Sequence, residues 1–246
     1  MARVKDVLNE GCYMRKAVRR ILLVLPLLLA GLSVSAQDKA AKVAQALEKI
    51  RAGAFWGAQA PAMELAQLAP APTESLPALI AALAEPSMPL RWSAAKALGQ
   101  MGPAAAEAGP ALAKALATGE WYPQRMAAWA LSQIGPAAQK AMPELLAAAK
   151  SNSHPLVRRE AIQALAALGP DARDALPLLA EKLEDENGFV RVAAAAALLR
   201  VGQDQHGLPV LVGALKDTSV VGARVAADAL AEVGPAAKAA EAALVA

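Results

Sequence analysis

Residues 131–150, LSQIGPAAQKAMPELLAAAK, decide the fold of this chain because they place helix breakers in a stretch that is otherwise helical in composition. Leucine and alanine recur at helical spacing on both sides of Gly135, Pro136 and Pro143. Glycine has no Cβ to clash in a left-handed conformation, so Gly135 predicts the end of one helix, which Pro136 cannot continue. Pro143 suits the first turn of a second helix, where its missing N–H costs nothing. The stretch therefore predicts two helices with a turn between them.

The same arrangement recurs along the chain, with steps of 32 to 34 residues between equivalent leucines. Each copy has a leucine, the reference leucine, four residues before a glycine; the pairs are Leu98–Gly102, Leu131–Gly135, Leu165–Gly169, Leu198–Gly202 and Leu230–Gly234. Alanine stands four residues and one residue before every reference leucine, and an apolar residue stands three after it. These offsets form one apolar stripe of an α-helix, and its small alanine side chains let a neighbouring helix approach closely.

A second proline marks the start of the next helix in each copy; these prolines are Pro77, Pro110, Pro143, Pro177 and Pro209. A repeated helix pair cannot bury its apolar face alone, so neighbouring copies must stack. We therefore predict an all-α fold, an α-solenoid of about six helix hairpins of about 33 residues, each made of the two helices that flank the glycine. We expect the second helix of each pair to line the concave face.

The pattern resembles HEAT repeats of the short bacterial type, also found in phycobilisome-lyase-like proteins, with the signature VR..A..AL...GP....LP.L. It is present as LVRREAIQALAALGPDARDALPLL and FVRVAAAAALLRVGQDQHGLPVL. The resemblance covers residues 57–246, with a degenerate first copy and a truncated last one, and residues 37–56 are expected to form a capping helix. It implies the solenoid architecture and leaves the function open, because such repeats serve many roles.

Residues 1–36 have the features of a secretory signal peptide, with Met14 as a possible true start. Basic residues precede the apolar run ILLVLPLLLAGLSV, and the small residues Val34 and Ala36 suit a signal peptidase that cleaves after Ala36. The run is short for a membrane span, so a retained membrane anchor is the alternative. Cleavage would leave a periplasmic or extracellular chain without cysteine, because Cys12 is the only one.

Charge and motifs argue against nucleic acid binding and against catalysis. The basic residues of the signal segment account for the net charge of +3, and the rest of the chain carries −1. The sequence holds no nucleophile elbow, phosphate-binding glycine loop or zinc-ligand spacing, and its two histidines, His154 and His206, are 52 residues apart. We therefore expect no enzyme activity, cofactor or metal.

Arginine stands six or seven residues before each reference leucine, and these residues are Arg91, Arg125, Arg158 with Arg159, Arg191 and Arg224. A short polar or acidic residue, such as Glu85 or Asp185, stands thirteen before it. The two positions predict a ladder of ion pairs in which each arginine pairs with the acidic turn of the preceding unit.

Aromatic residues occupy two positions that are mostly polar in the other copies. Trp92 lies six residues before its reference leucine and Trp129 two before, where Lys96 and Gln163 stand elsewhere. We predict a protein-binding patch formed by Trp92, Arg125 and Trp129, with Trp121 and Tyr122 in the adjoining turn. The alternative is that each ring folds over the next repeat and covers the alanine-rich core.

The sequence favours an exported, non-catalytic scaffold or adaptor that presents an extended surface to another protein. Two alternatives stay open. The resemblance implies a lyase-type enzyme related to phycobilin lyases, and a retained signal would give an envelope structural protein anchored in the membrane.

Overall fold

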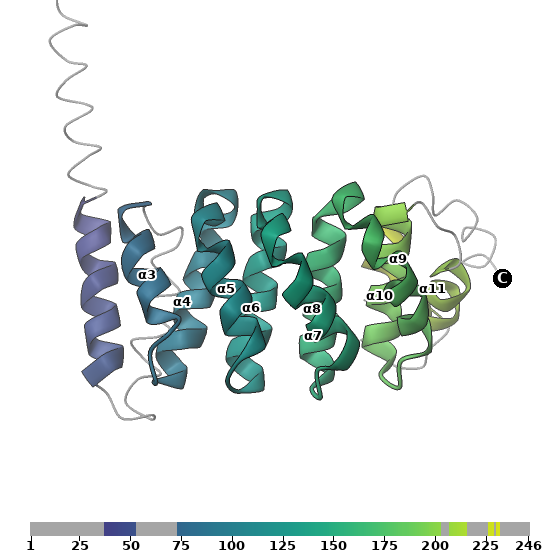
Figure 1. Cartoon of the computed structure of the whole chain (residues 1–246), viewed down its shortest axis with the longest axis horizontal. Helices are drawn as coiled ribbons and strands as arrows, with labels where there is room; N and C mark the ends of the chain where they lie inside the picture. Colours follow the sequence, from purple (N-terminus) through teal and green to yellow (C-terminus); the bar gives the residue numbers. More distant parts are fainter. Residues whose placement is uncertain (1–36, 53–72, 203–206, 216–225, 229, 232–246) are drawn as a thin grey trace, which may run out of the picture.

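The computed structural model describes residues 37–52, 73–202, 207–215, 226–228 and 230–231, and within these ranges it contains helices and short turns but no strand. Residues 37–52 form the first helix, and residues 226–228 and 230–231 are also helical. The elements between them are η1 (Thr73–Ser75), α3 (Leu76–Ala82), α4 (Met88–Met101), η2 (Gly102–Ala108), α5 (Gly109–Ala117), α6 (Trp121–Ile134), η3 (Gly135–Ala141), α7 (Met142–Ser151), α8 (Pro155–Ala167), η4 (Gly169–Ala175), α9 (Leu176–Glu181), η5 (Lys182–Glu184), α10 (Gly188–Gly202) and α11 (Leu208–Leu215). The predicted all-α solenoid is confirmed (Figure 1).

The helix pairs differ in phase from the prediction: each packed hairpin forms across a polar turn and not across the glycine that follows a reference leucine. The packed hairpins are α3–α4, α5–α6, α7–α8 and α9–α10, whose helices are joined by short polar turns. The helices on either side of a glycine, such as α4 and α5, have far less contact with each other. The Gly-Pro segments form the 3₁₀-helices η2, η3 and η4, each of seven residues. They therefore join one hairpin to the next instead of closing a hairpin.

Three of the repeat glycines have the positive φ that the sequence predicts, and the ψ values of Gly102 and Gly135 lie outside the left-handed helical region. Gly102 and Gly135 have φ of 58° and 69° with ψ of −137° and −141°, and φ of Gly169 is 64°. Positive φ with strongly negative ψ is open almost only to glycine. Gly202 differs, because it is not among the glycines with positive φ, and a Cβ there would lie 2.7 Å from Leu176 Cδ2, so the end of that leucine would have to shift. Gly234 lies outside the described residues.

We expect Gly135→Ala to lower the free energy of unfolding by about 1–3 kcal/mol, because alanine is strained at this φ and ψ. Gly109→Ala is the matched control. Gly109 has an ordinary helical φ of −48°, and a Cβ there would meet nothing within 4 Å. The control should be stabilising by about 0.4–1 kcal/mol. Urea unfolding followed by circular dichroism compares the two, and equal effects would contradict the conformational role of Gly135.

The second proline of each repeat lies in the first turn of a helix, as predicted. Pro77, Pro110, Pro143 and Pro177 stand at the start of α3, α5, α7 and α9, and Pro209 is the second residue of α11. Proline is tolerated there because the first N–H groups of a helix have no partner within it.

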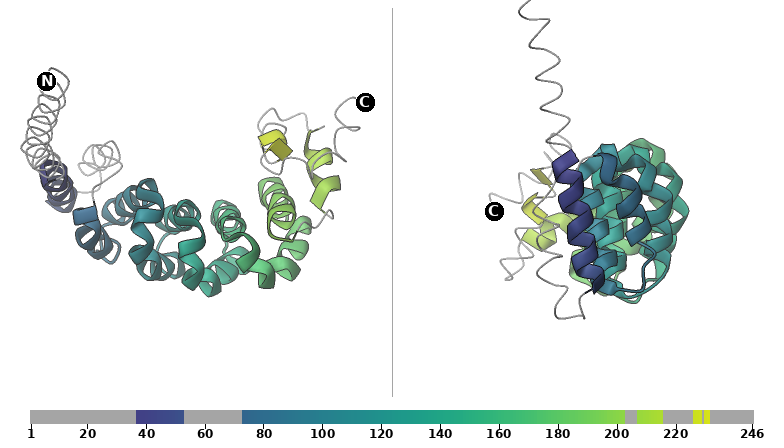
Figure 2. Two further views of the ribbon diagram at one scale, coloured as in Figure 1. Left: turned by 90° about the horizontal axis from the view of Figure 1, so that it is seen from above. Right: turned by 90° about the vertical axis from the view of Figure 1, so that its left-hand side faces the viewer.

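The described hairpins stack in chain order into an arc of two helix layers (Figures 1 and 2). In Figure 1, α5, α7 and α9 lie nearer the viewer, and α4, α6, α8 and α10 lie behind them. The view from above places the farther layer on the inside of the arc (Figure 2, left). The helices of this layer also pack directly on one another, as the shorter path inside a curve requires. The prediction for the concave face is therefore wrong: the helices that carry the reference leucines line it.

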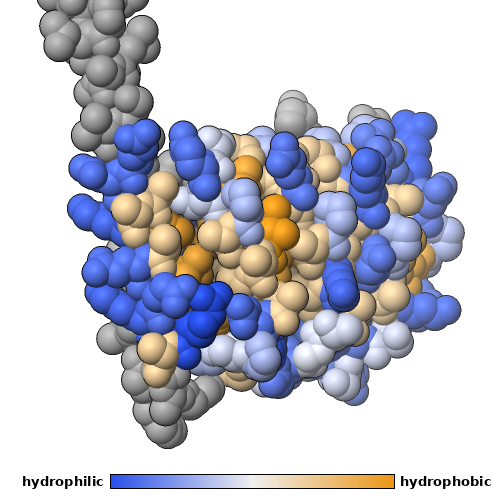
Figure 3. All heavy atoms as spheres, turned by 60° about the vertical axis from the view of Figure 1, so that its left-hand side comes forward, coloured by the Kyte–Doolittle hydropathy of each residue, from blue (hydrophilic) through white to orange (hydrophobic). Residues whose placement is uncertain are grey.

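The core follows the predicted apolar stripe. Both alanines and the reference leucine are buried in the four copies with Leu98, Leu131, Leu165 and Leu198, and Ala94, Leu98, Ala127, Leu131 and Ala161 are at 0% exposure. On the face shown in Figure 3, a band of moderately hydrophobic residues with a few strongly hydrophobic ones runs between hydrophilic residues.

The first described helix, residues 37–52, belongs to the same core. Val43 and Ile50 are fully buried, and Arg51 donates to the Glu85 carboxylate at 2.8 Å. Among the described residues, no helix is both long enough and apolar enough to cross a membrane. The predicted signal segment and most of the degenerate first copy lie outside those residues.

The arginines seven residues before the reference leucine share one arrangement, but they do not all pair as predicted. Arg91, Arg158 and Arg191 each donate from Nη1 to two carbonyl oxygens of the turn just before their own helix. The carboxylates that pair with Arg91 and Arg158 come from the turn of the following hairpin instead of the preceding one. In α6, Gln124 occupies this position and accepts from Asn152 Nδ2 at 3.0 Å. Arg224 lies outside the described residues.

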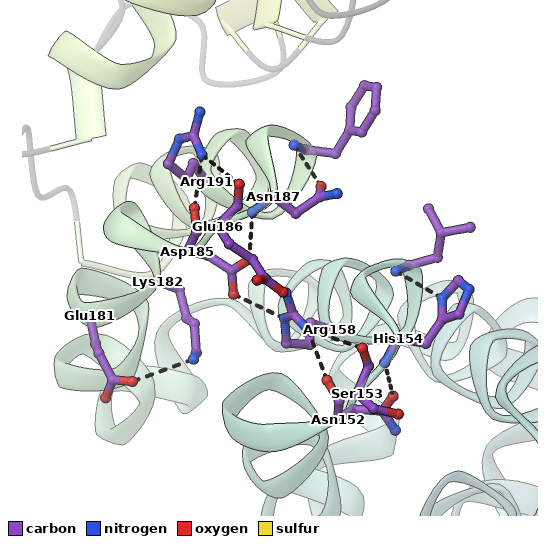
Figure 4. Close-up of polar contacts among 12 residues, drawn as sticks. Asn152, Ser153, His154, Arg158, Glu181, Lys182, Asp185, Glu186, Asn187 and Arg191 are labelled. Carbon is purple, nitrogen blue, oxygen red and sulfur yellow. Dashed lines mark hydrogen bonds and ion pairs between the residues drawn. The ribbon is translucent and has the colours of Figure 1, made fainter.

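The pair of Arg158 and Asp185 is the most buried of these contacts (Figure 4). Arg158 donates from Nε and Nη2 to the two carboxylate oxygens of Asp185 at 2.9 and 2.8 Å. Their side chains are only 8% and 5% exposed. Burial alone would raise the pKa of Asp185, but hydrogen bonds from Arg158 and the Asn187 N–H, together with the charges of Arg158 and Lys182, hold the pKa below its ordinary value. The same bonds raise the pKa of Arg158.

This lowered pKa predicts a loss of stability in acid. Above the ordinary value of 3.8, Asp185 is charged in both the folded and the unfolded chain, so its contribution is complete. As the pH falls below that value, the unfolded chain takes up the proton first, and stability is lost through the lower folded pKa. We expect Asp185→Asn to flatten the dependence of the unfolding midpoint on pH below about 4, whereas the exposed control Glu184→Gln should not. Equal curves would contradict the prediction.

Candidate interaction surface

The concave face contains a hollow of about 460 Å³ between α6, α8, α10 and the last described helical residues. Its lining combines aromatic, charged and polar side chains with alanines; among the former are Trp129, Arg159, Gln163, Phe189, Arg200 and Asp228. Gln163, Arg200 and Asp228 are exposed to solvent. The hollow therefore presents chemically varied side chains on the inside of the arc.

The lining comes from recurring positions of the repeat. Residues two before the reference leucine contribute Trp129, Gln163, Ala196 and Asp228, and the position six before it contributes Arg159. The apolar stripe of each helix points into the core, so these positions fall on the opposite, concave side. Side chains there can change between repeats without disturbing the stack.

Trp129 is held by a slot in the preceding repeat. A Cβ at Gly99 of α4 would lie 2.4 Å from Cζ3 and 2.8 Å from Cε3 of the Trp129 ring. The ring thus packs over the glycine while part of it lines the hollow. This contact fixes a partly exposed aromatic side chain in one orientation.

Two arginines share one buried carboxylate beside Trp129. Glu160 of α8 is 4% exposed, and its Oε1 accepts from Arg125 Nε at 3.2 Å and from Arg159 Nη2 at 2.5 Å. The side chains of Arg125 and Arg159 are 27% and 21% exposed. One carboxylate thus holds two cations at the surface, and the group keeps a net positive charge.

A row of aromatic rings crosses three helices near their N-terminal ends. Trp92 of α4 meets Tyr122 of α6 edge-on at 5.7 Å, and Tyr122 meets Trp121 edge-on at 5.4 Å. Trp121, which is 42% exposed, stacks on His154 at 4.0 Å with 3° between the planes. His154 also caps α8, because its Nδ1 accepts from the Leu156 N–H at 3.3 Å. Trp92 and Tyr122 pack against the core, so Trp121 is the most exposed of the three tryptophan and tyrosine rings in this row.

The structure divides the predicted patch between these two features. Trp92, Trp121 and Tyr122 belong to the aromatic row, whereas Trp129 lines the hollow and Arg125 is bound to Glu160. A binding role for the patch stays a prediction. The contacts of Trp92 with Tyr122 and of Trp121 with His154 also cross repeat boundaries, as in the alternative in which the rings cover the core.

Sequence reasoning did not single out three residues that organise this surface: Gly99, His154 as a ring partner, and Glu160. Glu160 offered a signal in the sequence, because it places a carboxylate five residues before a reference leucine, where the earlier repeats have Ser93 and Met126. The structure buries the side chain at this position in all three repeats. Among the described residues, no three His, Cys, Asp or Glu side chains lie close enough together to hold a metal ion.

Comparison with known proteins agrees with this architecture. The family described as HEAT repeats matches residues 47–132, 76–166, 109–199 and 142–231. Three of these matches begin at the first residue of α3, α5 and α7, so they follow the observed hairpin phase. A comparison with curated protein sequences finds no match.

Solved structures of other repeat proteins are similar to this chain. The complex of CpcE and CpcF of phycocyanin lyase from Nostoc sp. PCC7120 contains a chain of 27% identity, with 77% of this chain and 76% of that chain covered and a TM-score of 0.62. An engineered protein has 22% identity, 79% and 97% coverage and a TM-score of 0.54. A designed armadillo repeat protein in complex with the peptide (KR)4 has 19% identity, 77% and 98% coverage and a TM-score of 0.50. The last two support the fold alone.

Proposed function

This chain belongs to the HEAT repeat family, and from that premise we propose that it is an exported, non-catalytic scaffold or adaptor that binds another protein on its concave face. Repeat folds of this kind present extended surfaces to protein partners. The hollow on α6, α8 and α10 is the observation that carries the proposal, because its lining places an oriented tryptophan and Arg159 on that face, and Glu160 holds Arg125 beside Arg159. Tryptophan and arginine are the residues most enriched in interaction hot spots.

A photo-crosslinking amino acid at Gln163 tests this proposal. Gln163 is exposed inside the hollow, and Gln139 of η3 is an exposed glutamine outside its lining, so it is the matched control. In cells that produce the chain, we expect a protein crosslink from Gln163 and none of the same mass from Gln139. The crosslink should weaken when Trp129→Gln is added. Equal crosslinks from both sites, or none from Gln163, would contradict binding on the concave face.

Export is the second part of the proposal. Residues 1–36 combine basic residues, an apolar run and small residues before Gln37. We expect the mature protein recovered from the envelope fraction to begin at Gln37, as N-terminal sequencing would show. A chain that retains the apolar run would favour the alternative of a membrane-anchored structural protein.

A lyase-type enzyme is the other candidate, and its support is the similarity to a phycocyanin lyase complex at 27% identity. Two features of the chain count against it: its only cysteine is Cys12, within the predicted signal, and its two histidines are far apart in sequence. Visible absorbance from a bound chromophore, or turnover by the purified protein, would favour the enzyme over the scaffold.

A further inference from the structure

We propose that the concave face at the hollow, together with Arg125 beside it, binds an extended acidic segment of the partner, whose carboxylates, three residues apart, pair with Arg125 and Arg159. The inference rests on the proposed function, since it names the chemistry of the protein that the concave face would take.

The charge of the concave face supports an acidic ligand. Arg125 and Arg159 occupy the same repeat position on neighbouring helices, and both bind one oxygen of the buried Glu160. Two positive charges against one negative charge leave the pair able to accept a further carboxylate. Lys96 of α4 adds a partly exposed positive charge at the position that Trp129 and Gln163 occupy in the next two repeats. Guanidinium groups bind carboxylates with stronger hydrogen bonds than neutral donors do.

The repeat spacing supports an extended conformation. Packed helix axes lie about 8–10 Å apart, so equivalent positions on α6 and α8 are separated by about that distance. A chain in the extended polyproline II conformation advances about 3.1 Å per residue with three residues per turn, so side chains three residues apart point to the same side. Three residues therefore span the step between Arg125 and Arg159, and two side chains three residues apart meet the two arginines.

The lining of the hollow supports close approach by such a chain. Ala166, Ala167, Ala193 and Ala196 form small-residue surface between α8 and α10, where a backbone can lie against the helices. Trp129, held by its contact with Gly99, offers a flat apolar surface beside the arginines. An apolar side chain between two acidic ones would pack there. The expected motif is therefore an acidic residue, then two residues of which one is apolar, then a second acidic residue.

Peptide binding to the full-length chain tests this inference. The probe is a fluorescein-labelled peptide of three Glu-Ala-Leu triplets, compared with its Lys-Ala-Leu counterpart and with an isomer whose three glutamates are consecutive. Fluorescence anisotropy should show the triplet peptide binding about tenfold tighter than the lysine peptide, and several-fold tighter than the isomer. Its affinity should also fall as salt is raised.

Variants locate the site. Arg159→Gln and Arg125→Gln should each weaken binding of the triplet peptide by about tenfold, because each removes a charged donor. Lys114→Gln, on the exposed side of α5 outside the hollow, is the control and should leave affinity unchanged. Circular dichroism melts identify any variant that fails to fold, and in that case Arg159→Lys, which keeps the charge, should bind better than Arg159→Gln.

The possible results separate this inference from the proposed function. No binding of the triplet peptide at about 1 mM, equal binding of the lysine peptide, or full affinity of both arginine variants would overturn the acidic ligand. If the Gln163 crosslink still captures a protein in that case, the concave scaffold stands and only its partner chemistry is wrong. Loss of that crosslink as well would remove the proposed function.

Discussion

Replacement of Arg158 by methionine is expected to lower the free energy of unfolding by about 3–5 kcal/mol, because it leaves the carboxylate of Asp185 buried without its cation. Arg158 and Asp185 are 8% and 5% exposed and are joined by two hydrogen bonds. Arg158 also donates to the Asn152 carbonyl oxygen at 3.0 Å, so the substitution removes a bond that ties the turn to the helix. Methionine keeps the apolar stem, and the loss is therefore mainly electrostatic.

Arg91→Met is the matched control for this prediction. Arg91 makes the same carbonyl contacts with its own turn, at 2.9 and 2.7 Å, but its partner Glu120 is 53% exposed. A solvated carboxylate loses little when its cation is removed, so the ion pair itself should contribute about 0–1 kcal/mol. Urea unfolding of both variants measures the difference. A loss for Arg158→Met no larger than that for Arg91→Met would show that burial of the pair does not matter.

Local chemistry made most of the fold predictable. The alanines and the reference leucine repeat at helical spacing, and their burial follows from which side of a helix must face its neighbours. Gly135 and Pro143 act within a few residues of themselves, so a single sequence suffices to place them. Seven-residue 3₁₀-helices were not predicted, because Gly-Pro followed by alanines does not separate a 3₁₀-helix from a turn.

The phase of the hairpins could not be predicted in the same way. In a periodic chain each helix has a connecting segment at both ends. Helix-breaking residues show where these segments lie, but not which of the two connects the helices of a packed hairpin. A turn such as residues 152–154 brings α7 and α8 into contact, whereas seven residues of η3 hold α6 and α7 apart. The curvature of the stack, and so the identity of the concave face, depends on this difference in distance.

The candidate site was predictable only in part. The position two before the reference leucine faces solvent as predicted at Gln163 and Asp228, because it opposes the apolar stripe, whereas Val192 at the position six before it is only 5% exposed. Contacts between repeats depend on which side chains meet across helices. Glu160 beneath two arginines, His154 on Trp121 and Gly99 under Trp129 are contacts of this kind, and no spacing within one helix reveals them.

Gly99→Ala is expected to destabilise the chain by about 1–3 kcal/mol through overpacking, although alanine favours helices over glycine. A Cβ at this position would lie 2.4 Å from the Trp129 ring and 3.0 Å from the Ala130 Cα, so the ring must leave its slot. Gly213→Ala in α11 is the control, because a Cβ there would meet nothing within 4 Å. The control should raise stability by up to about 1 kcal/mol. Thermal unfolding compares the two variants, and a Gly99→Ala protein that is as stable as the control would show that the slot is not tight.

The repeats themselves supply a rescue for this substitution. The position of Gly99 holds Ser132 in α6 and Ala166 in α8, and the position of Trp129 holds Gln163 in α8 and Ala196 in α10. Gly99 therefore faces the largest of these side chains, Trp129, whereas the larger residues Ser132 and Ala166 face smaller side chains. Trp129→Gln added to Gly99→Ala recreates a pair close to Ser132 and Gln163, and it should restore most of the lost stability while it weakens the crosslink from Gln163. If the double variant is less stable than Gly99→Ala alone, Trp129 stabilises the stack by contacts other than its fit over Gly99, and the size of the residue at position 99 is not what orients the ring toward the hollow.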